Sequence, residues 1–250
     1  MRQAALAGLL AGSLMLAASA CADGPGWAPP AAAWFEAPGD VYPHRVLGAI
    51  PEYFVLAARD AAGRETRLDL REAPGPPRVF EDVAPRVVDA DGDGTAEIVV
   101  VQSDLQDGAQ LAIYEIRGGA LALEAATPTI GQRFRWLAPV TIADLDGDGV
   151  TDLAYVETPH LGKRLRVWTW APGGLTEIAR TDGVTNHRIG DETISGGLRD
   201  CGAGPEMVLA DAAWGGLVAV TLAPDRQLER RPLDLPATPE GFAAAAACEG

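Results

Sequence analysis

The sequence predicts an all-β protein with the architecture of a β-propeller, most simply four blades of four antiparallel strands each. Three observations support this fold class: an acidic segment recurs about every 54 residues, short apolar runs of strand length fill the intervals, and no amphipathic helix of useful length separates them. Because one four-stranded sheet cannot bury both of its faces, such a repeat indicates sheets packed on one another around an axis. A five-bladed ring and an incomplete ring that a second chain completes are the alternatives.

The first segment of the chain has the features of a secretory signal peptide, which we place at residues 1–20. A positively charged start and an apolar stretch precede Ala18-Ser19-Ala20, which fits a leader-peptidase site. Residues 21–33 are then expected to form a linker, and residues 34–250 the propeller of four repeats. The sequence therefore predicts an exported protein.

The cysteines support export. The segment AASAC, which ends at Cys21, resembles the lipobox of bacterial lipoproteins, in which the cysteine is acylated and becomes the new N-terminus. Lipidation of Cys21 predicts a periplasmic or outer-membrane (cell-surface) lipoprotein that is held to the membrane only by its acyl chain, and a plain cleaved signal peptide is the alternative.

If Cys21 carries lipid, Cys201 and Cys248 remain as a pair. We expect them to form a disulfide in an oxidising compartment, with two separate buried thiols as the alternative.

The charge balance argues against nucleic acid as a partner. The chain has 35 acidic and 20 basic residues, which gives a formal net charge of −15 at pH 7. A surface of that sign repels phosphate backbones, but it suits an exported protein that binds cations. After residue 20 no apolar run of about twenty residues occurs, so we expect no membrane-spanning helix.

Two copies of the repeat are intact. VVDADGDGTAEIVVV covers residues 87–101, and TIADLDGDGVTDLAYVE covers residues 141–157. Two further copies are degenerate: FEAPGDVYPHRVLGAI, in which His44 aligns with Glu97 of the first intact copy, and LRDCGAGPEMVLAD, which retains Glu206. Four copies at this period fill the chain after the signal peptide and so favour four blades.

Apolar runs between the acidic segments predict the strands in order. After the first intact copy we expect strands at residues 98–103, 109–116, 121–127 and 133–143, and after the second at residues 153–157, 164–170, 175–181 and 187–195. Gly, Pro, Asp and Asn separate these runs. Residues 242–248 are expected to form the outer strand of the last blade, although five consecutive alanines fit a helical turn equally well.

The acidic segments have the composition of calcium-binding loops, because Ca²⁺ takes about six to eight oxygen ligands and glycine lets a short loop bend around them. In the first loop we expect side-chain ligands from Asp89, Asp91, Asp93 and Glu97 and a backbone carbonyl ligand from Thr95. In the second loop the same roles fall to Asp144, Asp146, Asp148, Asp152 and Val150. The sequence therefore predicts two Ca²⁺ sites. Mg²⁺ suits them less well, because it demands stricter octahedral geometry.

An EF-hand opens with the same residues, but it needs a bidentate acid at its twelfth position, where this chain has Val100 and Tyr155. The segments DADGDGTAEIV and DLDGDGVTDLA instead resemble the calcium loops of FG-GAP/VCBS repeat proteins, relatives of the integrin α-subunit propeller. The resemblance implies a calcium-clamped scaffold that binds a protein or glycan ligand without catalysis. It also implies that each loop joins the outer strand of one blade to the inner strand of the next.

The chain offers few residues for catalysis. Its three histidines, His44, His160 and His187, lie in no recognisable nucleophile or triad motif. We expect His44 to be a satisfied strand residue and the other two to be solvated. Trp168 and Trp170 share one strand face, where packing between blades is expected and a sugar-stacking platform is the alternative. A small exported hydrolase or carbohydrate-processing enzyme on the same scaffold is the alternative function.

Overall fold

The protein is all-β, with a single short helix in the part of the chain that the structure describes. The structure is a computed structural model, and it describes residues 26–171 and 174–249. The predicted signal peptide and Cys21 lie outside the described residues. Within these residues no helix combines the length and the apolar character needed to cross a membrane.

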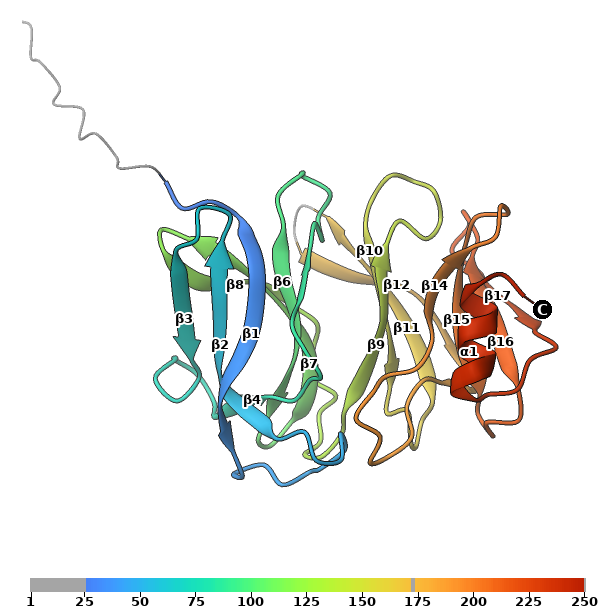
Figure 1. Ribbon diagram of the computed structural model, residues 1–250, viewed down its shortest axis with the longest axis horizontal. Helices are drawn as coiled ribbons and strands as arrows, with labels where there is room; N and C mark the ends of the chain where they lie inside the picture. The colour runs from blue at the N-terminus through green and yellow to red at the C-terminus, as the bar shows by residue number, and fades with distance from the viewer. Residues whose placement is uncertain (1–25, 172–173, 250) are drawn as a thin grey trace, which may run out of the picture.

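The strands form three antiparallel sheets (Figure 1). The first sheet contains β1 (Pro30–Gly39), β2 (Glu52–Asp60), β3 (Glu65–Asp69), β4 (Arg78–Phe80), β5 (Arg86–Val88), β6 (Glu97–Asp104), β7 (Gly108–Arg117) and β8 (Ala120–Ala126). The second contains β9 (Leu137–Ala143), β10 (Asp152–Glu157), β11 (Arg164–Ala171) and β12 (Gly174–Asp182). The third contains β13 (Val184–Thr185), β14 (Gly197–Asp200), β15 (Pro205–Asp211), β16 (Leu217–Leu222) and β17 (Leu228–Pro232).

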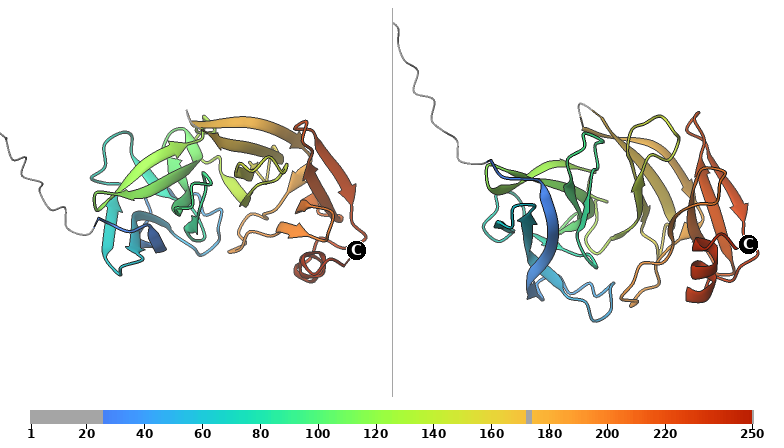
Figure 2. Two further views of the ribbon diagram at one scale, coloured as in Figure 1. Left: turned by 90° about the horizontal axis from the view of Figure 1, so that it is seen from above. Right: turned by 45° about the horizontal axis from the view of Figure 1, so that its top comes forward.

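The first sheet has two parts that meet at β4. This strand pairs with β6 along its whole length but with β2 only where Phe80 faces Tyr53. One part is therefore β1-β2-β3 and the other is β5-β6-β7-β8. Seen from above, the sheets follow one another in chain order along an arc (Figure 2), which is consistent with a β-propeller. Because hydrogen bonding links the first two parts into one sheet, the number of blades stays a prediction.

Neighbouring sheets bury their faces against each other. All eight residues of β6 are buried, as its continuous apolar run indicates for a strand covered on both faces. Val99 and Val101 of this strand pack in one cluster with Leu153 and Tyr155 of β10. Trp168 is buried in the same cluster and Trp170 packs against it, so the packing interpretation of these two residues is confirmed. A second cluster joins β10 and β11 to β15 and β16.

Two local expectations from the sequence were wrong, and at a third place the helical alternative is confirmed. Strand β1 begins at Pro30, inside the expected linker 21–33. Residues 187–195 form a loop rather than a strand, and β13 and β14 lie on either side of it. Residues 239–246 form the helix α1 (Pro239–Ala246) instead of an outer strand, with the Thr238 side chain accepting a hydrogen bond from the Gly241 N–H at its N-terminus.

A disulfide ties the end of the chain to the third sheet. The Sγ atoms of Cys201 and Cys248 are bonded at 2.07 Å, across a sequence separation of 47 residues. The bond connects the turn after β14 with the residues that follow α1. Arg199 of β14 also donates to the carbonyl oxygen of Ala245 at 2.9 Å, so a hydrogen bond supports the same attachment.

The first and last parts of the arc meet through loops. The Gly190 N–H donates to the carbonyl oxygen of Val46 at 2.9 Å, which joins the β1–β2 loop to the loop before β14. Gly48 has a φ of +64°, and a Cβ at this position would lie 2.4 Å from the Gly190 carbonyl oxygen. The approach of the two loops therefore requires glycine at position 48.

Candidate metal centres

The two acidic loops have the same internal hydrogen bonds. In the β5–β6 loop, Asp89 accepts from the N–H groups of Gly92 at 2.8 Å and Gly94 at 2.9 Å. In the β9–β10 loop, Asp144 accepts at 2.8 Å and 3.0 Å from the glycines at the matching positions, Gly147 and Gly149. All four glycines have φ between +78° and +88°, which other residues rarely adopt. The sequence pattern thus folds into one backbone conformation twice.

Each loop brings three carboxylates to a common point. Ligand oxygens of Asp89, Asp91 and Glu97 all lie within 4.8 Å of one another. Those of Asp144, Asp146 and Asp152 do the same. Within the described residues, these are the two groups of at least three metal-ligating side chains that converge in this way.

The remaining predicted ligands lie outside these clusters. Asp93 accepts a hydrogen bond from the Thr95 N–H at 2.7 Å, and Asp148 accepts one from the Val150 N–H at 2.8 Å. Metal binding by these two aspartates, and by the carbonyl groups of Thr95 and Val150, stays a prediction. The structure therefore assembles three of the five expected ligands in each loop.

One carboxylate in each cluster is buried at the start of a strand. Glu97 is 3% exposed and Asp152 is 2% exposed. Burial raises the pKa of Glu97 to about 7 and the pKa of Asp152 to about 6. A hydrogen bond from one backbone N–H to each carboxylate lowers the pKa, whereas repulsion from the neighbouring aspartates raises it further. A cation at the centre of each cluster would favour the charged forms. The donor sets therefore fit a hard divalent metal ion, since every side-chain ligand is a carboxylate oxygen.

The comparison with protein families identifies the segment that contains both loops. A model of the FG-GAP-like repeat matches residues 89–155. This segment is similar to an FG-GAP-like repeat. The match begins at Asp89, the first acid of the first loop, and ends within β10, just past the second loop. The FG-GAP-like repeat therefore covers one full period of the chain, from one metal centre to the next. No curated protein matches the chain.

The first degenerate copy of the repeat lies at Glu52, and its predicted alignment at His44 was wrong. In the two intact copies the buried carboxylate accepts from the N–H seven residues earlier, Ala90 at 2.8 Å for Glu97 and Leu145 at 3.1 Å for Asp152. Glu52 begins β2 and accepts from the N–H of Arg45, also seven residues earlier, at 3.4 Å. The alignment failed because it assumed a constant period, whereas the first interval is about ten residues shorter.

In the last degenerate copy, the carboxylate at the start of the strand pairs with two arginines. Glu206 of β15 forms ion pairs with Arg199 at 2.8 Å and with Arg231 at 3.0 Å. Burial opposes ionisation of Glu206, but its hydrogen bonds to Arg231 and Arg199 hold its pKa below the ordinary value. The two guanidinium groups thus supply the positive charge that a metal ion would supply in the intact copies.

The histidines lie far from the metal centres and are less exposed than the sequence predicts. His187 is fully buried rather than solvated, and half-buried His160 hydrogen-bonds to it at 2.9 Å. His44 lies in a loop and not in a strand, with Nδ1 2.6 Å from a carboxylate oxygen of buried Glu81. No local motif signals this arrangement, because the three histidines come from three separate loops.

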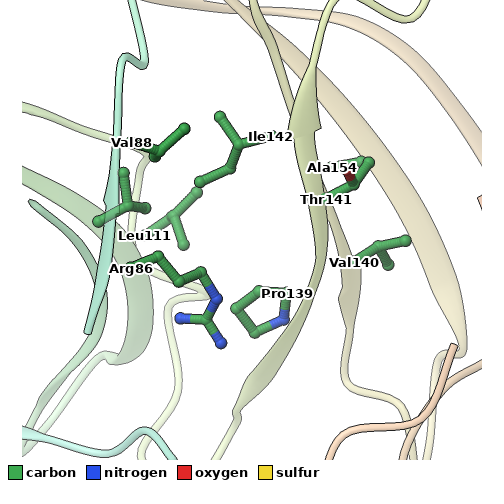
Figure 3. A pocket seen from close by; sticks show the side chains of 9 residues that line it. Arg86, Val88, Leu111, Pro139, Val140, Thr141, Ile142 and Ala154 are labelled. Atoms are coloured by element: carbon green, nitrogen blue, oxygen red, sulfur yellow. The ribbon is translucent and has the colours of Figure 1, made fainter. Parts of the chain in front are cut away.

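An apolar cavity of about 200 Å³ lies between the first and second sheets. Figure 3 shows Val88 and Leu111 on one side of it and Ile142 and Ala154 on the other. The charged lining residue, Arg86, is held by both oxygens of Asp82 at 2.8 and 3.1 Å. This cavity therefore offers no free charge to a ligand.

Proposed function

We propose that the protein is an exported, calcium-stabilised β-propeller that acts as a non-catalytic binding module. The observation that carries this proposal is the repetition of one acid cluster, with the same hydrogen bonds and glycine conformations, at two successive junctions between strands. In this proposal Ca²⁺ holds each loop in place, and the ions serve stability rather than catalysis.

Contact between the two loops supports a role for the ions in joining sheets. A Cβ at Gly92 of the first loop would lie 3.8 Å from Oγ1 of Thr151 in the second, so the loops lie against each other. Each loop also leads into a buried strand, β6 or β10. Ions bound in both loops would therefore stiffen the packing between the first and second sheets.

The same proposal extends to the number of blades, the location of the protein and the class of its ligand. We infer four blades arranged around one axis, formed by β1-β2-β3, β5-β6-β7-β8, the second sheet and the third sheet. The chain would be exported and anchored through a lipid on Cys21 in the periplasm or at the cell surface. Its ligand would be a protein or a glycan, and the acidic surface argues against nucleic acid.

A second function, a small exported hydrolase, is favoured by one observation. Glu81 accepts a hydrogen bond from Ser103 at 2.5 Å and contacts His44 Nδ1 at 2.6 Å. A buried carboxylate that orients an imidazole is a common arrangement for a general base. Among the described residues no serine, threonine or cysteine side chain hydrogen-bonds to this imidazole, so we prefer the binding role.

Thermal unfolding with and without Ca²⁺ tests the proposed function. Each site is expected to stabilise the fold by about 2.7 kcal/mol when free Ca²⁺ is about a hundredfold above Kd. For a chain of this size that is about 5–10 °C in Tm per site. Asp91→Asn and Asp146→Asn should each remove about half of the total calcium-dependent shift, because each removes one ligand cluster.

Asp225→Asn is the matched control, since Asp225 is an exposed aspartate in a turn and accepts one backbone hydrogen bond, as Asp91 does. This variant should keep the full calcium shift. Equal Tm values for the wild-type protein in calcium and in chelator would contradict the proposal.

A further inference from the structure

Four arginines without a carboxylate partner gather at the end of the molecule opposite the metal centres. Within the described residues, the guanidinium groups of Arg45, Arg133, Arg135 and Arg188 form no ion pair with an acid. Arg133 instead lies over the Phe134 ring at 4.6 Å, and Arg135 donates to the Phe134 carbonyl oxygen at 3.3 Å. Arg188 stacks over the Trp214 ring at 4.1 Å. Of the four, Arg135 is the one whose side chain lines the cavity at this end of the molecule.

This arrangement is unusual because acids are in excess. The chain has 35 acidic residues against 20 basic ones, and many other arginines pair with acids. Arg166, for example, contacts both Glu157 and Glu177. Arg135 forms no such pair although it lines a cavity, so its guanidinium group is available to an anionic ligand.

A cavity of about 280 Å³ lies beside Arg135. Arg135 lines it directly, and the other three each neighbour a lining residue in the sequence: His44, Phe134 and Ile189. Thr158, which follows β10, also lines it, whereas the acidic loop precedes the same strand. The cavity and the second metal centre therefore lie at opposite ends of β10, about 20 Å apart by strand length.

The rest of the cavity wall is apolar and aromatic. Leu161 and Ile189 line it, yet they are 63% and 68% exposed, which is high for large aliphatic side chains. Trp136, 2% exposed, forms part of its base. An apolar lining with a few charged groups is typical of sites that bind an organic molecule rather than a bare inorganic ion.

The two histidines that line the cavity, His160 and His44, are held in fixed orientations by hydrogen bonds. His187 must donate from Nε2 to the carbonyl oxygen of Asp191, at 2.9 Å, so its Nδ1 accepts from Nε2–H of His160. His44 is oriented through Nδ1 by Glu81, which leaves Nε2 without a protein partner and not sealed from solvent.

The backbone around the cavity is strained. Phe134 and Thr158, which both line it, have φ of 59° and 45°, and Arg45 has φ of 54°. Residues with side chains rarely adopt this conformation. Such outliers cluster at ligand sites, where they place side chains that relaxed backbone would direct elsewhere.

We propose that this cavity binds a small organic carboxylate, whose compact apolar body contacts Leu161, Ile189 and Phe134 and whose carboxylate meets Arg135. The proposal deepens the binding role above by naming a ligand class and a site. It does not require calcium, because none of the acidic-loop residues line the cavity.

Calorimetric titration with matched probes tests this site. The probes are phenylacetate, 4-phenylbutyrate and decanoate, each compared with its neutral amide, which has nearly the same shape. At least one carboxylate should bind at millimolar concentration or below, and its amide should bind at least about tenfold more weakly, because charge-assisted hydrogen bonds to arginine are lost. Absence of binding by all three carboxylates, or equal affinity for acid and amide, would overturn the proposal.

Two variants and a matched control locate the site. Arg135→Ala should weaken carboxylate binding by about tenfold or more, and Leu161→Asp should do the same by placing a negative charge on the exposed rim. Arg226→Ala removes an equally unpaired arginine from the distant β16–β17 turn and should leave binding within about twofold. An equal effect of Arg135→Ala and Arg226→Ala would contradict the assignment.

The two proposals fail in different ways. The double variant Asp91→Asn/Asp146→Asn, studied below its melting temperature, should lose calcium-dependent stabilisation and keep carboxylate binding. A protein that shows the calcium shift but binds no carboxylate would overturn only the inference about the cavity. A protein that binds the carboxylate but shows no calcium shift would overturn only the proposed role of calcium.

Discussion

Replacing Asp82 with alanine is expected to lower the free energy of unfolding by about 3–5 kcal/mol. Asp82 is fully buried and accepts hydrogen bonds from the backbone N–H groups of Val83 and Val101, both at 2.8 Å. It also forms the two-pronged ion pair with Arg86 at the start of β5. Alanine would leave a buried N–H in β6 and a partly buried guanidinium without partners, and each is costly.

Chemical denaturation of the variant measures this effect. Asp69→Ala is the matched control, since Asp69 also accepts a backbone N–H and pairs with an arginine, Arg71, but does so at the surface. The control should change stability by less than about 1 kcal/mol. Similar decreases in the free energy of unfolding for the two variants would show that burial of the Asp82–Arg86 pair does not matter to the stability of the fold.

Removing the disulfide is expected to cost about 4 kcal/mol, which is the loop-closure value for a bond that spans 47 residues. The variant is Cys201→Ser/Cys248→Ser, and its stability is compared with that of the oxidised wild-type protein by denaturation. Because Arg199 still holds the carbonyl oxygen of Ala245, α1 should stay attached in the native state. Most of the loss should therefore come from a less constrained unfolded chain.

Reduction of the wild-type protein provides an independent check. The reduced wild type and the double serine variant should unfold at the same denaturant concentration, since both lack the same cross-link. A double variant whose free energy of unfolding falls by less than about 1 kcal/mol would contradict the expectation.

The acidic loops are the part of the molecule that the sequence predicts best. Their geometry depends on nearby residues, because aspartates bind N–H groups two to five positions ahead and glycines supply the positive φ. The strands that follow are equally clear, since β6 and β10 are buried on both faces and read as continuous apolar runs. Local chemistry and local structure agree at these positions, and the sequence therefore carries the information.

The errors occur where distant segments decide the structure. His44, His160 and His187 come together only because the β1–β2 loop meets the loops that follow β10 and β13, and nothing near each histidine indicates this. Residues 187–195 were expected to form a strand, but the N–H groups of Gly190 and Ser195 donate to the carbonyl oxygens of Val46 and Asn186 instead of to a neighbouring strand. Long-range contacts of this kind override local propensity.

The helix α1 could have been predicted from the sequence itself. Thr238, Pro239 and Glu240 form an N-cap, a first helical proline and an acid in the first turn, and a run of alanines follows. Together these are the usual signals of a helix start. The expected strand at residues 242–248 gave more weight to the repeat period than to these local signals.

Direct titration with Ca²⁺ tests the central claim of the account, that the two acidic clusters bind metal ions. Isothermal calorimetry of the metal-free protein should reveal two Ca²⁺ ions per chain, one of which is lost in Asp91→Asn and the other in Asp146→Asn. A wild-type protein that takes up no Ca²⁺, or a double variant that still binds two ions, would contradict the claim.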